Sequence, residues 1–281
     1  MKATQKIFSI ISITRPVNFL ITFFSITVAG IICSVGDFKI RNILLAAVAG
    51  AFIGSGGNII NDIYDIDIDR INRPQRILPS NKMTITEAWL SYFSFTVIAL
   101  VLTVFINFPS FAIAVFSSIV IFFYSKSLKK IPLFGNVTVA FFTGLAFIFG
   151  GMAVDNWTYA IIPAVFAFFI NFIREIVKDI EDIEGDRANG VITFPQKFGE
   201  RNAAKLISVF TILLIAITVF PFLLNIYSIE YFIIVMLTVN VLLVYFLKRL
   251  FMKDVNYRSI GNLLKLIMIF GLIAIYAGSK Q

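Results

Sequence analysis

Residues 41–72 read RNILLAAVAGAFIGSGGNIINDIYDIDIDRIN, an apolar run that passes directly into a segment with four aspartates. The apolar part, 41–60, has the length of a helix that crosses a lipid bilayer. The acidic part begins where that helix would leave the hydrocarbon. The chain therefore places a concentration of negative charge at the end of a membrane-spanning element.

The composition of the whole chain is that of a membrane protein. Of the 281 residues, 59% are hydrophobic and 14% are charged, and the mean hydropathy is +0.91. A soluble domain of this length carries more polar surface. The sequence predicts an all-α, polytopic membrane protein with nine spans, at about 17–36, 41–60, 86–106, 110–125, 133–153, 158–175, 203–224, 228–247 and 260–278. Four glycines of the second span predict close helix packing: Gly50, Gly54, Gly56 and Gly57.

The distribution of basic residues predicts the orientation. When the loops are numbered from the N-terminus, 21 of the 24 Lys and Arg residues fall on one side, leaving Lys39, Arg41 and Lys280 opposite. By the positive-inside tendency, the basic side with the N-terminus is cytoplasmic and the C-terminus is outside. The two long interruptions, 61–85 and 176–202, fall on the cytoplasmic side, where we expect the function.

Several classes of function are excluded by what the chain lacks. It has no histidine and one cysteine, Cys33, so histidine-based zinc sites, Ser-His triads, multi-cysteine metal sites and internal disulfides are absent. The net charge of +8 is explained by topology and attraction to anionic lipid, and no soluble basic domain remains to bind nucleic acid. We expect a single integral domain over 1–281 and no obligatory protein partner.

A second acidic segment repeats the first 117 positions later. Residues 178–189 read KDIEDIEGDRAN, and seven of the eleven positions from Asp179 to Asn189 are identical to those from Asp62 to Asn72. The repeat, taken as 58–72 and 175–189, holds ten of the sixteen acidic residues. Acid clustered twice at one spacing predicts a doubled cation site.

On a helix, at about 100° per residue, the acids of each segment fall on one stripe. The first stripe has Asn58, Asp62, Asp65 and Asp69, flanked by Asn61, and the second has Glu175, Asp179, Asp182 and Asp186, flanked by Lys178. Two carboxylates ~5 Å apart repel each other by about 3 kcal/mol at an effective dielectric of ~20. Oxygen ligands without His or Cys favour Mg²⁺ or Ca²⁺, and two facing stripes with interleaved bases would hold a diphosphate through bridging metals. The alternative is a pair of solvated helix ends whose acids balance nearby bases.

These segments resemble the two motifs of the UbiA superfamily of intramembrane prenyltransferases. The motif Asn-Asp-x-x-Asp-x-x-x-Asp is matched by Asn61, Asp62, Asp65 and Asp69, and Asp-x-x-Asp-x-x-x-Asp by Asp179, Asp182 and Asp186. Three shorter elements are also similar: Asn72-Arg73-Pro74-x-Arg76 ending in Leu78-Pro79-Ser80, Tyr124-Ser125 with Leu128-Lys129, and Thr14-Arg15-Pro16-x-Asn18. Ile77 stands where the family has a proline, which leaves the charged residues unaffected.

The resemblance implies a fold and a set of roles. It implies nine helices around a central cavity with cytoplasmic caps, and Mg²⁺ ions that bind the diphosphate of a polyprenyl donor. The implied metal ligands are Asp62, Asp65, Asp179 and Asp182, followed by Asn58, Glu175, Asp69 and Asp186. The implied phosphate-binding residues are Arg73, Arg76, Lys126, Lys129 and Lys178, with Asn58 and Asn61. Tyr124 would polarise the diphosphate or stabilise a carbocation, and Arg15 and Asn18 would line the acceptor end.

Within the superfamily, the chain looks most like the archaeal enzymes that make digeranylgeranylglyceryl phosphate. That likeness implies geranylgeranyl diphosphate as donor and geranylgeranylglyceryl phosphate, a lipid phosphate, as acceptor. Two alternatives remain at this point. One is prenylation of an aromatic acceptor in quinone synthesis, and the other is a cation-coupled transporter, which would place carboxylates near the bilayer midplane.

Overall fold

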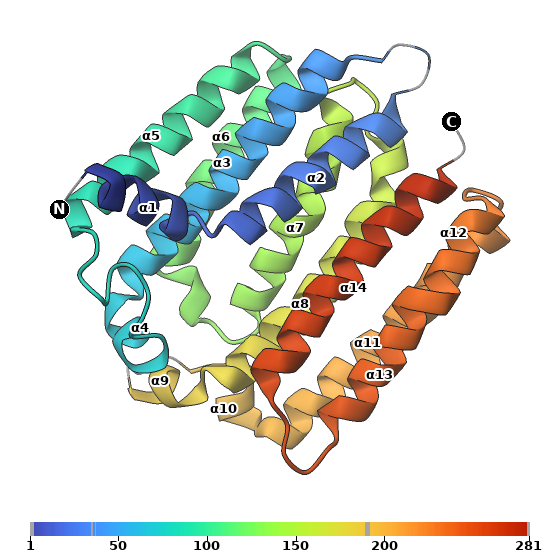
Figure 1. Ribbon diagram of the computed structural model, residues 1–281. Coiled ribbons are helices and arrows are strands. Elements are labelled where there is room, and N and C mark those ends of the chain that lie inside the picture. Colours follow the sequence, from blue (N-terminus) through green and yellow to red (C-terminus); the bar gives the residue numbers. More distant parts are fainter. Residues whose placement is uncertain (1–2, 35, 37, 189–191, 280–281) are drawn as a thin grey trace.

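The computed structural model describes residues 3–34, 36, 38–188 and 192–279 (Figure 1). Asn189, the end of the second repeat, lies outside the described residues, as do Lys2 and Lys280 of the charge count. The described residues are helical and include no β-strand. The elements are α1 (Ala3–Ile13), α2 (Pro16–Cys33), α3 (Ile40–Tyr64), α4 (Ile66–Asn72), α5 (Ile85–Val104), α6 (Phe108–Lys126), η1 (Leu128–Lys130), α7 (Phe134–Met152), η2 (Thr158–Ala160), α8 (Ile161–Glu181), α9 (Ile183–Ala188), α10 (Phe194–Phe198), α11 (Glu200–Leu223), α12 (Ile229–Ile234), η3 (Val235–Asn240, a π-helical turn), α13 (Val241–Leu250) and α14 (Tyr257–Gly278).

The nine predicted spans are confirmed. Within the described part of the chain, nine helical stretches are long and apolar enough to cross a membrane, and each overlaps one predicted span. Two of these stretches are composite: Thr158–Glu181 joins η2 to α8, and Ile229–Leu250 joins α12, η3 and α13. The second and sixth spans run furthest beyond their predicted ends, because their helices continue into the acidic segments.

The length of these two spans explains where the acids lie. The helix α3 has 25 residues, or roughly 37 Å at 1.5 Å per residue, whereas the hydrocarbon core is ~30 Å thick. The span that ends with α8 has 24 residues and is nearly as long. Both helices are therefore long enough for their last turns to extend beyond the hydrocarbon, where charged side chains are far less costly than at mid-bilayer.

The spans form one bundle whose short helices gather at one end. The helix α3 packs against α2, α5 and α6, while α8 packs against α7, α11 and α14. The short helices α4, α9 and α10 lie together at the lower end in Figure 1, and the C-terminal end of α14 lies at the opposite end. These short helices correspond to the predicted caps.

Two of the four glycines in α3 lie in close contact with side chains of neighbouring helices. A Cβ atom on Gly50 would lie 2.2 Å from Ile26 Cδ1, and one on Gly57 would lie 3.1 Å from Ile121 Cγ2. At Gly54 and Gly56 the nearest atoms would be at ordinary contact distances of 3.7 Å and 3.6 Å. The prediction of close approach is thus confirmed at Gly50 and Gly57 only.

A cavity of about 940 Å³ lies inside the bundle and confirms the predicted central hollow. It is lined by residues of α1, α2, α3, α6, α7, α8 and α14, by Asn72 at the end of α4 and by the segment that follows it. Its apolar wall includes Ile26, Ile53, Ile113, Phe142, Phe149 and Met268. Three glycines of α3, Gly50, Gly54 and Gly57, line this space as well, so the helix that carries the first acidic segment leaves room beside it for an apolar ligand.

Candidate active site

Each acidic segment bends at its middle aspartate, which corrects the expectation of one straight helix per stripe. The helix α3 ends at Tyr64 and α4 begins at Ile66, with Asp65 between them at φ −101° and ψ 10°. In the second segment, Asp182 separates α8 from α9 at φ −98° and ψ 7°. The amide hydrogen bonds continue across both bends, since Asp65 N donates to Asn61 O at 2.9 Å. The equivalent aspartate of each repeat therefore marks a bend between two helices.

The bends bring the two segments into direct contact. The helices α4 and α9 pack against each other, and Asn72 Nδ2 donates to the carbonyl oxygen of Asp182 at 3.3 Å. A Cβ atom on Gly185 would lie 2.1 Å from Asn72 Oδ1, so any side chain there would displace the Asn72 amide. The two acidic surfaces, far apart in the sequence, thus meet at one place.

The acids of both segments line a small pocket of about 90 Å³. It holds six of the eight stripe residues: Asp65, Asp69, Glu175, Asp179, Asp182 and Asp186. The other two, Asn58 and Asp62, line the large cavity instead. The pocket and the cavity share seven lining residues, which join them into one hollow: Asn61, Asn72, Arg73, Arg76, Tyr124, Glu175 and Lys178.

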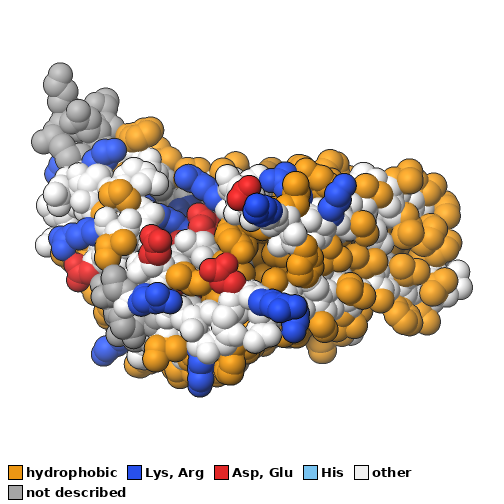
Figure 2. Space-filling model, turned by 90° about the horizontal axis from the view of Figure 1, so that it is seen from below, with side chains coloured by type: hydrophobic (Ala, Val, Ile, Leu, Met, Phe, Trp, Pro, Cys, Tyr) orange, Lys and Arg blue, Asp and Glu red, His pale blue; other side chains and the backbone are white. Residues whose placement is uncertain are grey.

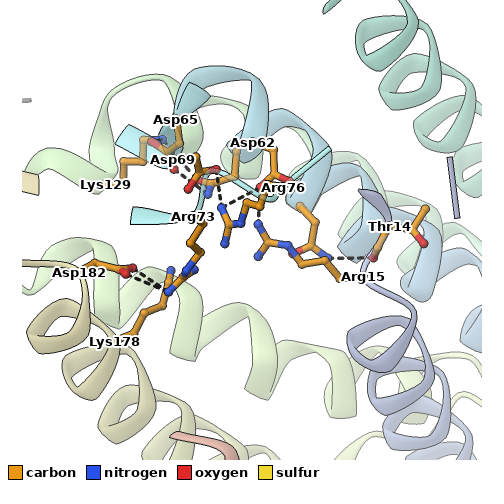
Figure 3. Close-up of polar contacts among 12 residues, drawn as sticks. Thr14, Arg15, Asp62, Asp65, Asp69, Arg73, Arg76, Lys129, Lys178 and Asp182 are labelled. Atoms are coloured by element: carbon orange, nitrogen blue, oxygen red, sulfur yellow. Dashed lines mark hydrogen bonds and ion pairs between the residues drawn. The ribbon is translucent and has the colours of Figure 1, made fainter. Parts of the chain in front are cut away.

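Two arginines after α4 tie the acids together (Figure 3). Arg76 Nη1 donates to Asp69 Oδ2 at 2.5 Å and to Asp62 Oδ1 at 3.3 Å. Arg73 Nη2 reaches across to the second segment and donates to both carboxylate oxygens of Asp182, at 2.9 Å and 3.0 Å. Arg73 therefore links the first repeat to the second by a charge-assisted hydrogen bond.

Two further bases come from other parts of the chain. Lys129, in η1, pairs with Asp65, and Arg15, just before α2, pairs with Asp62. Both pairs are largely buried, and the side chain of Lys129 is only 12% exposed. Asn61 Nδ2 also donates to Asp65 at 2.8 Å, so Asp65, at the bend of the first segment, has partners from α3 and η1.

The second stripe has different partners. Glu175, which is buried, accepts from Arg174 at 2.9 Å and from Lys178 at 3.5 Å. Asp179 accepts from the amide of Asn136 at 2.9 Å. Asp186 lines the pocket beside them, and its charge interacts with those of Asp182 and Asp65. Basic groups therefore neutralise the first stripe more completely than the second.

Burial changes the acidity of the groups that lie outside the spans. For Asp186, burial and then the charge of Asp182 raise the pKa from 3.8 to about 7. For Lys129, burial lowers the pKa, and the opposing charge of Asp65 offsets part of this effect. For Arg76, burial lowers the pKa, but the charges of Asp62 and Asp69 outweigh it, and the net pKa lies above the usual value. Arg76 is therefore always a cation, while Asp186 titrates near neutral pH.

The pocket suits a divalent cation that is shared with a ligand. Among the described side chains, no group of three acids converges closely enough to enclose a metal by itself. Mg²⁺ uses one or two carboxylates and completes its shell with water and phosphate oxygens, so six carboxylates around one pocket fit it. The Thr193 hydroxyl, which is buried beside these acids, has no hydrogen-bond partner within the described part of the protein. A bound oxyanion would satisfy such a donor.

Most of the predicted site residues lie in this hollow. Asn58, Arg15 and Asn18 line the large cavity, and Asn58 Nδ2 donates to Thr14 O at 3.3 Å. Tyr124 lines both spaces. Lys126 is the exception, because it is exposed and lines neither space. It lies two residues from Tyr124, so on the helix α6 it faces away from the site, and its role in phosphate binding stays a prediction that its position does not support.

Three polar residues of the pocket were not anticipated as site residues: Asn72, Asn136 and Thr193. Asn136 lies near the start of an apolar span, and an isolated amide in such a run is a usable signal. Asn72 could have been found from the repeat, because Asn189 occupies the same position in the second segment. Thr193 has no distinguishing pattern in the sequence.

The fold and this site define a class: a polytopic helical membrane protein with paired acidic segments that meet at the mouth of an apolar cavity. The chain belongs to the UbiA prenyltransferase family, whose profile matches residues 22–259. It is therefore an intramembrane prenyltransferase, which confirms the resemblance seen in the sequence.

Individual proteins of the family are similar to this chain over nearly its whole length. The digeranylgeranylglyceryl phosphate synthase of Methanococcus aeolicus is 34% identical over 273 residues, which cover 96% of each chain. A solved structure of digeranylgeranylglyceryl phosphate synthase in membranes is 32% identical, with a TM-score of 0.76 over 98% of each chain. A UbiA homologue from Archaeoglobus fulgidus, solved with DMAPP and Mg²⁺, has a TM-score of 0.69 at 21% identity, over 95% of this chain and 99% of that one.

Proposed function

We propose that this enzyme transfers a geranylgeranyl group from its diphosphate to geranylgeranylglyceryl phosphate, forming the second ether bond of archaeal membrane lipids. The names of its relatives support this choice of substrates, since those relatives align over nearly the whole chain. The observation that carries the proposal is the meeting of both acidic segments in one pocket that opens into a large apolar cavity. A phosphate-bearing head and an apolar chain each have a suitable space there.

The donor diphosphate would occupy the small pocket. Asp65, Asp69, Glu175, Asp179, Asp182 and Asp186 are the carboxylates that would hold Mg²⁺ there. When bound, Mg²⁺ supplies positive charge that stabilises the leaving diphosphate. Arg73, Arg76 and Lys129 already lie among these carboxylates and are positioned to donate hydrogen bonds to phosphate oxygens. The Archaeoglobus homologue, which was solved with DMAPP and Mg²⁺, supports this assignment.

The residues around the pocket would then favour replacement of the diphosphate at C1 of the prenyl group by the acceptor hydroxyl. The bond between C1 of the prenyl group and the diphosphate oxygen breaks, and its electron pair leaves with the diphosphate. The basic side chains of the pocket stabilise the negative charge that develops on the leaving group. The free glycerol hydroxyl forms the new bond to C1 and releases its proton. Tyr124, which lines both spaces, lies at the boundary where this exchange would take place.

The large cavity would hold the prenyl chains away from water. Its wall is apolar along α3, α6 and α7, so an allylic carbocation formed at its mouth would meet few competing nucleophiles. The acidic end of the bundle would face the cytoplasm, with the C-terminus outside, as the basic residues predict. The charged end in Figure 2 supports this orientation, since acidic and basic side chains gather over one part of that face. The whole chain would act as one integral domain.

Product formation by the purified protein tests the proposal. In detergent with Mg²⁺ and labelled geranylgeranyl diphosphate, we expect a diether lipid product with geranylgeranylglyceryl phosphate as acceptor. We expect no product with 4-hydroxybenzoate or a naphthoate, which represent the aromatic acceptors. Product with an aromatic acceptor and none with the lipid phosphate would replace the proposal by the quinone alternative.

A further inference from the structure

A row of polar and basic side chains on α14 faces the large cavity, outside the acidic pocket. Arg258, Asn262 and Lys265 are spaced by four and three residues, so they share one face of the helix. All three line the cavity, and so does Arg174 on the neighbouring helix α8. The helices α8 and α14 pack against each other, and the charges of Arg174 and Lys265 act on one another. None of these residues lines the small pocket.

Orientation in the membrane explains Arg258, the second residue of α14, but it does not explain Arg174 or Lys265. A topology marker lies at the end of a span, whereas Lys265 lies two turns inside α14 and Arg174 lies two turns before the end of α8. Both side chains are partly buried. An ionisable group inside a membrane span is costly and is usually kept for a function.

The charge of this group is also poorly balanced. Eight basic residues line the large cavity: Arg15, Arg73, Arg76, Lys82, Arg174, Lys178, Arg258 and Lys265. Of the acids that the structure describes, three line it: Asp62, Glu175 and Glu181. Within the described residues, neither Arg258 nor Lys265 has a carboxylate at ion-pair distance, whereas Arg73, Arg76 and Lys129 all do. Among the described side chains, Arg174 has one carboxylate at ion-pair distance, Glu175, and shares it with Lys178.

We propose that Arg174, Arg258, Asn262 and Lys265 form a second anion site that binds the phosphate of the lipid acceptor, separate from the diphosphate site of the donor. This inference rests on the proposed function. The α14 wall continues past Lys265 to Met268, so a ligand held by its phosphate there can extend its prenyl chain into the apolar cavity. Arg174 precedes Glu175, which lines both spaces, so the bound head group lies at the border with the pocket that holds the donor.

Steady-state kinetics with two acceptors test the site. We compare Lys265→Gln and Arg258→Gln with wild type, using geranylgeranylglyceryl phosphate and the same prenyl glycerol ether without its phosphate. We expect each variant to raise KM for the phosphorylated acceptor by about tenfold, the effect of one charge-assisted hydrogen bond. KM for geranylgeranyl diphosphate and kcat/KM for the phosphate-free acceptor should stay within about twofold. An equal loss with both acceptors, or a raised KM for the donor, would overturn the assignment.

Two controls separate the site from folding. Lys265→Arg keeps the charge and should restore most of the affinity for the phosphorylated acceptor. Lys253→Gln removes an exposed positive charge just before α14 and away from both spaces, so its KM values should equal those of wild type. A Lys253→Gln variant with the same loss as Lys265→Gln would assign the effect to general surface charge and reject the site.

Binding without turnover separates this inference from the proposed function. Radiolabelled geranylgeranylglyceryl phosphate is bound to the protein with neither donor nor Mg²⁺ present, for wild type and Lys265→Gln. Weaker binding by the variant supports the site even if no diether is ever formed, in which case only the proposed function fails. Equal binding by both proteins, alongside normal product formation by wild type, rejects the site and leaves the function standing.

Discussion

Arg73 and Arg76 form ion pairs with different acidic segments. Arg76 lies against Asp69 and Asp62 of the first segment, and Arg73 reaches Asp182 of the second. An ionised carboxylate that is buried without a partner costs several kcal/mol, so these bases hold the acids in their ionised form inside the protein. The same guanidinium groups are well suited to bind phosphate oxygens in pairs. At the residue scale, the site is therefore preorganised for a diphosphate that binds together with Mg²⁺.

Lys129 and Lys126 give a matched pair of substitutions at this scale. Lys129 is buried against Asp65, whereas Lys126, three residues earlier, is exposed and outside both spaces. We expect Lys129→Gln to lower kcat/KM for geranylgeranyl diphosphate on the order of a hundredfold, because it removes a phosphate donor and leaves Asp65 without its base. We expect Lys126→Gln to stay within about twofold of wild type. Initial-rate measurements at varied donor concentration check both, and equal losses would contradict the placement of Lys129 in the site.

At the scale of elements, the site depends on two short helices that could not fold alone. The helices α4 and α9 have seven and six residues, well below the length at which an isolated helix is stable in water. They are held by contact with each other and by the spans that they continue. The contact is tight at Gly185, where a side chain would overlap the amide of Asn72. The distance between the two acidic stripes is thus set by a small, specific packing contact.

Gly185→Ala tests that contact. The added methyl group must displace Asn72 and with it the hydrogen bond to the carbonyl of Asp182. We expect a loss of about 1–3 kcal/mol of stability, seen as a lower apparent Tm in detergent, together with reduced turnover. In the double variant with Asn72→Ala, the overlap disappears, so the fall in Tm should be smaller than the sum of the single changes. Additive changes in Tm would show that the two residues are not in contact.

At the scale of the whole molecule, the pocket exists because two distant spans end at the same place. The first segment follows α3 and the second follows α8, and both lie at the lower end of the bundle in Figure 1. The pocket that they line shares residues with the large cavity inside the bundle. Acids from both segments interact across this hollow, since the charges of Asp182 and Asp65 both raise the pKa of Asp186, after the larger effect of burial. The electrostatics of the site is therefore a property of the folded bundle.

The dependence of activity on Mg²⁺ and pH follows from this interaction. Asp186 has a pKa raised to about 7, so its carboxyl group is neutral below that pH and anionic above it. Because protons and Mg²⁺ compete for the carboxylate, the Mg²⁺ concentration for half-maximal activity should fall by up to about tenfold per unit as the pH rises toward 7, and then level off. Removing the metal with EDTA should abolish turnover. In Asp186→Asn the residual activity should lose this pH dependence, and an unchanged profile would show that another group is responsible.

Much of the fold was predictable because its causes are local in the sequence. Each span is a continuous apolar run, so its existence follows from the cost of exposing it to water, and all nine were found, although the second and sixth run on into the acidic segments. The acidic segments were equally visible, because a charge repeated in register at the end of a span is rare in an apolar chain. Their residue types alone favoured a divalent cation and a diphosphate.

What the sequence determined by itself is the number of spans, the paired acids and the kind of ligand that they suit, because burial of apolar surface and repulsion between like charges act on residues that are neighbours in the chain. The tertiary structure decided which face of each helix turns inward. In the folded protein the acidic segments bend at Asp65 and Asp182, and Lys126 lies outside both the pocket and the cavity. Asn136 lines the pocket, and Lys265 lines the cavity. This arrangement depends on packing between helices that are distant in the sequence, for which a single chain carries no local signal.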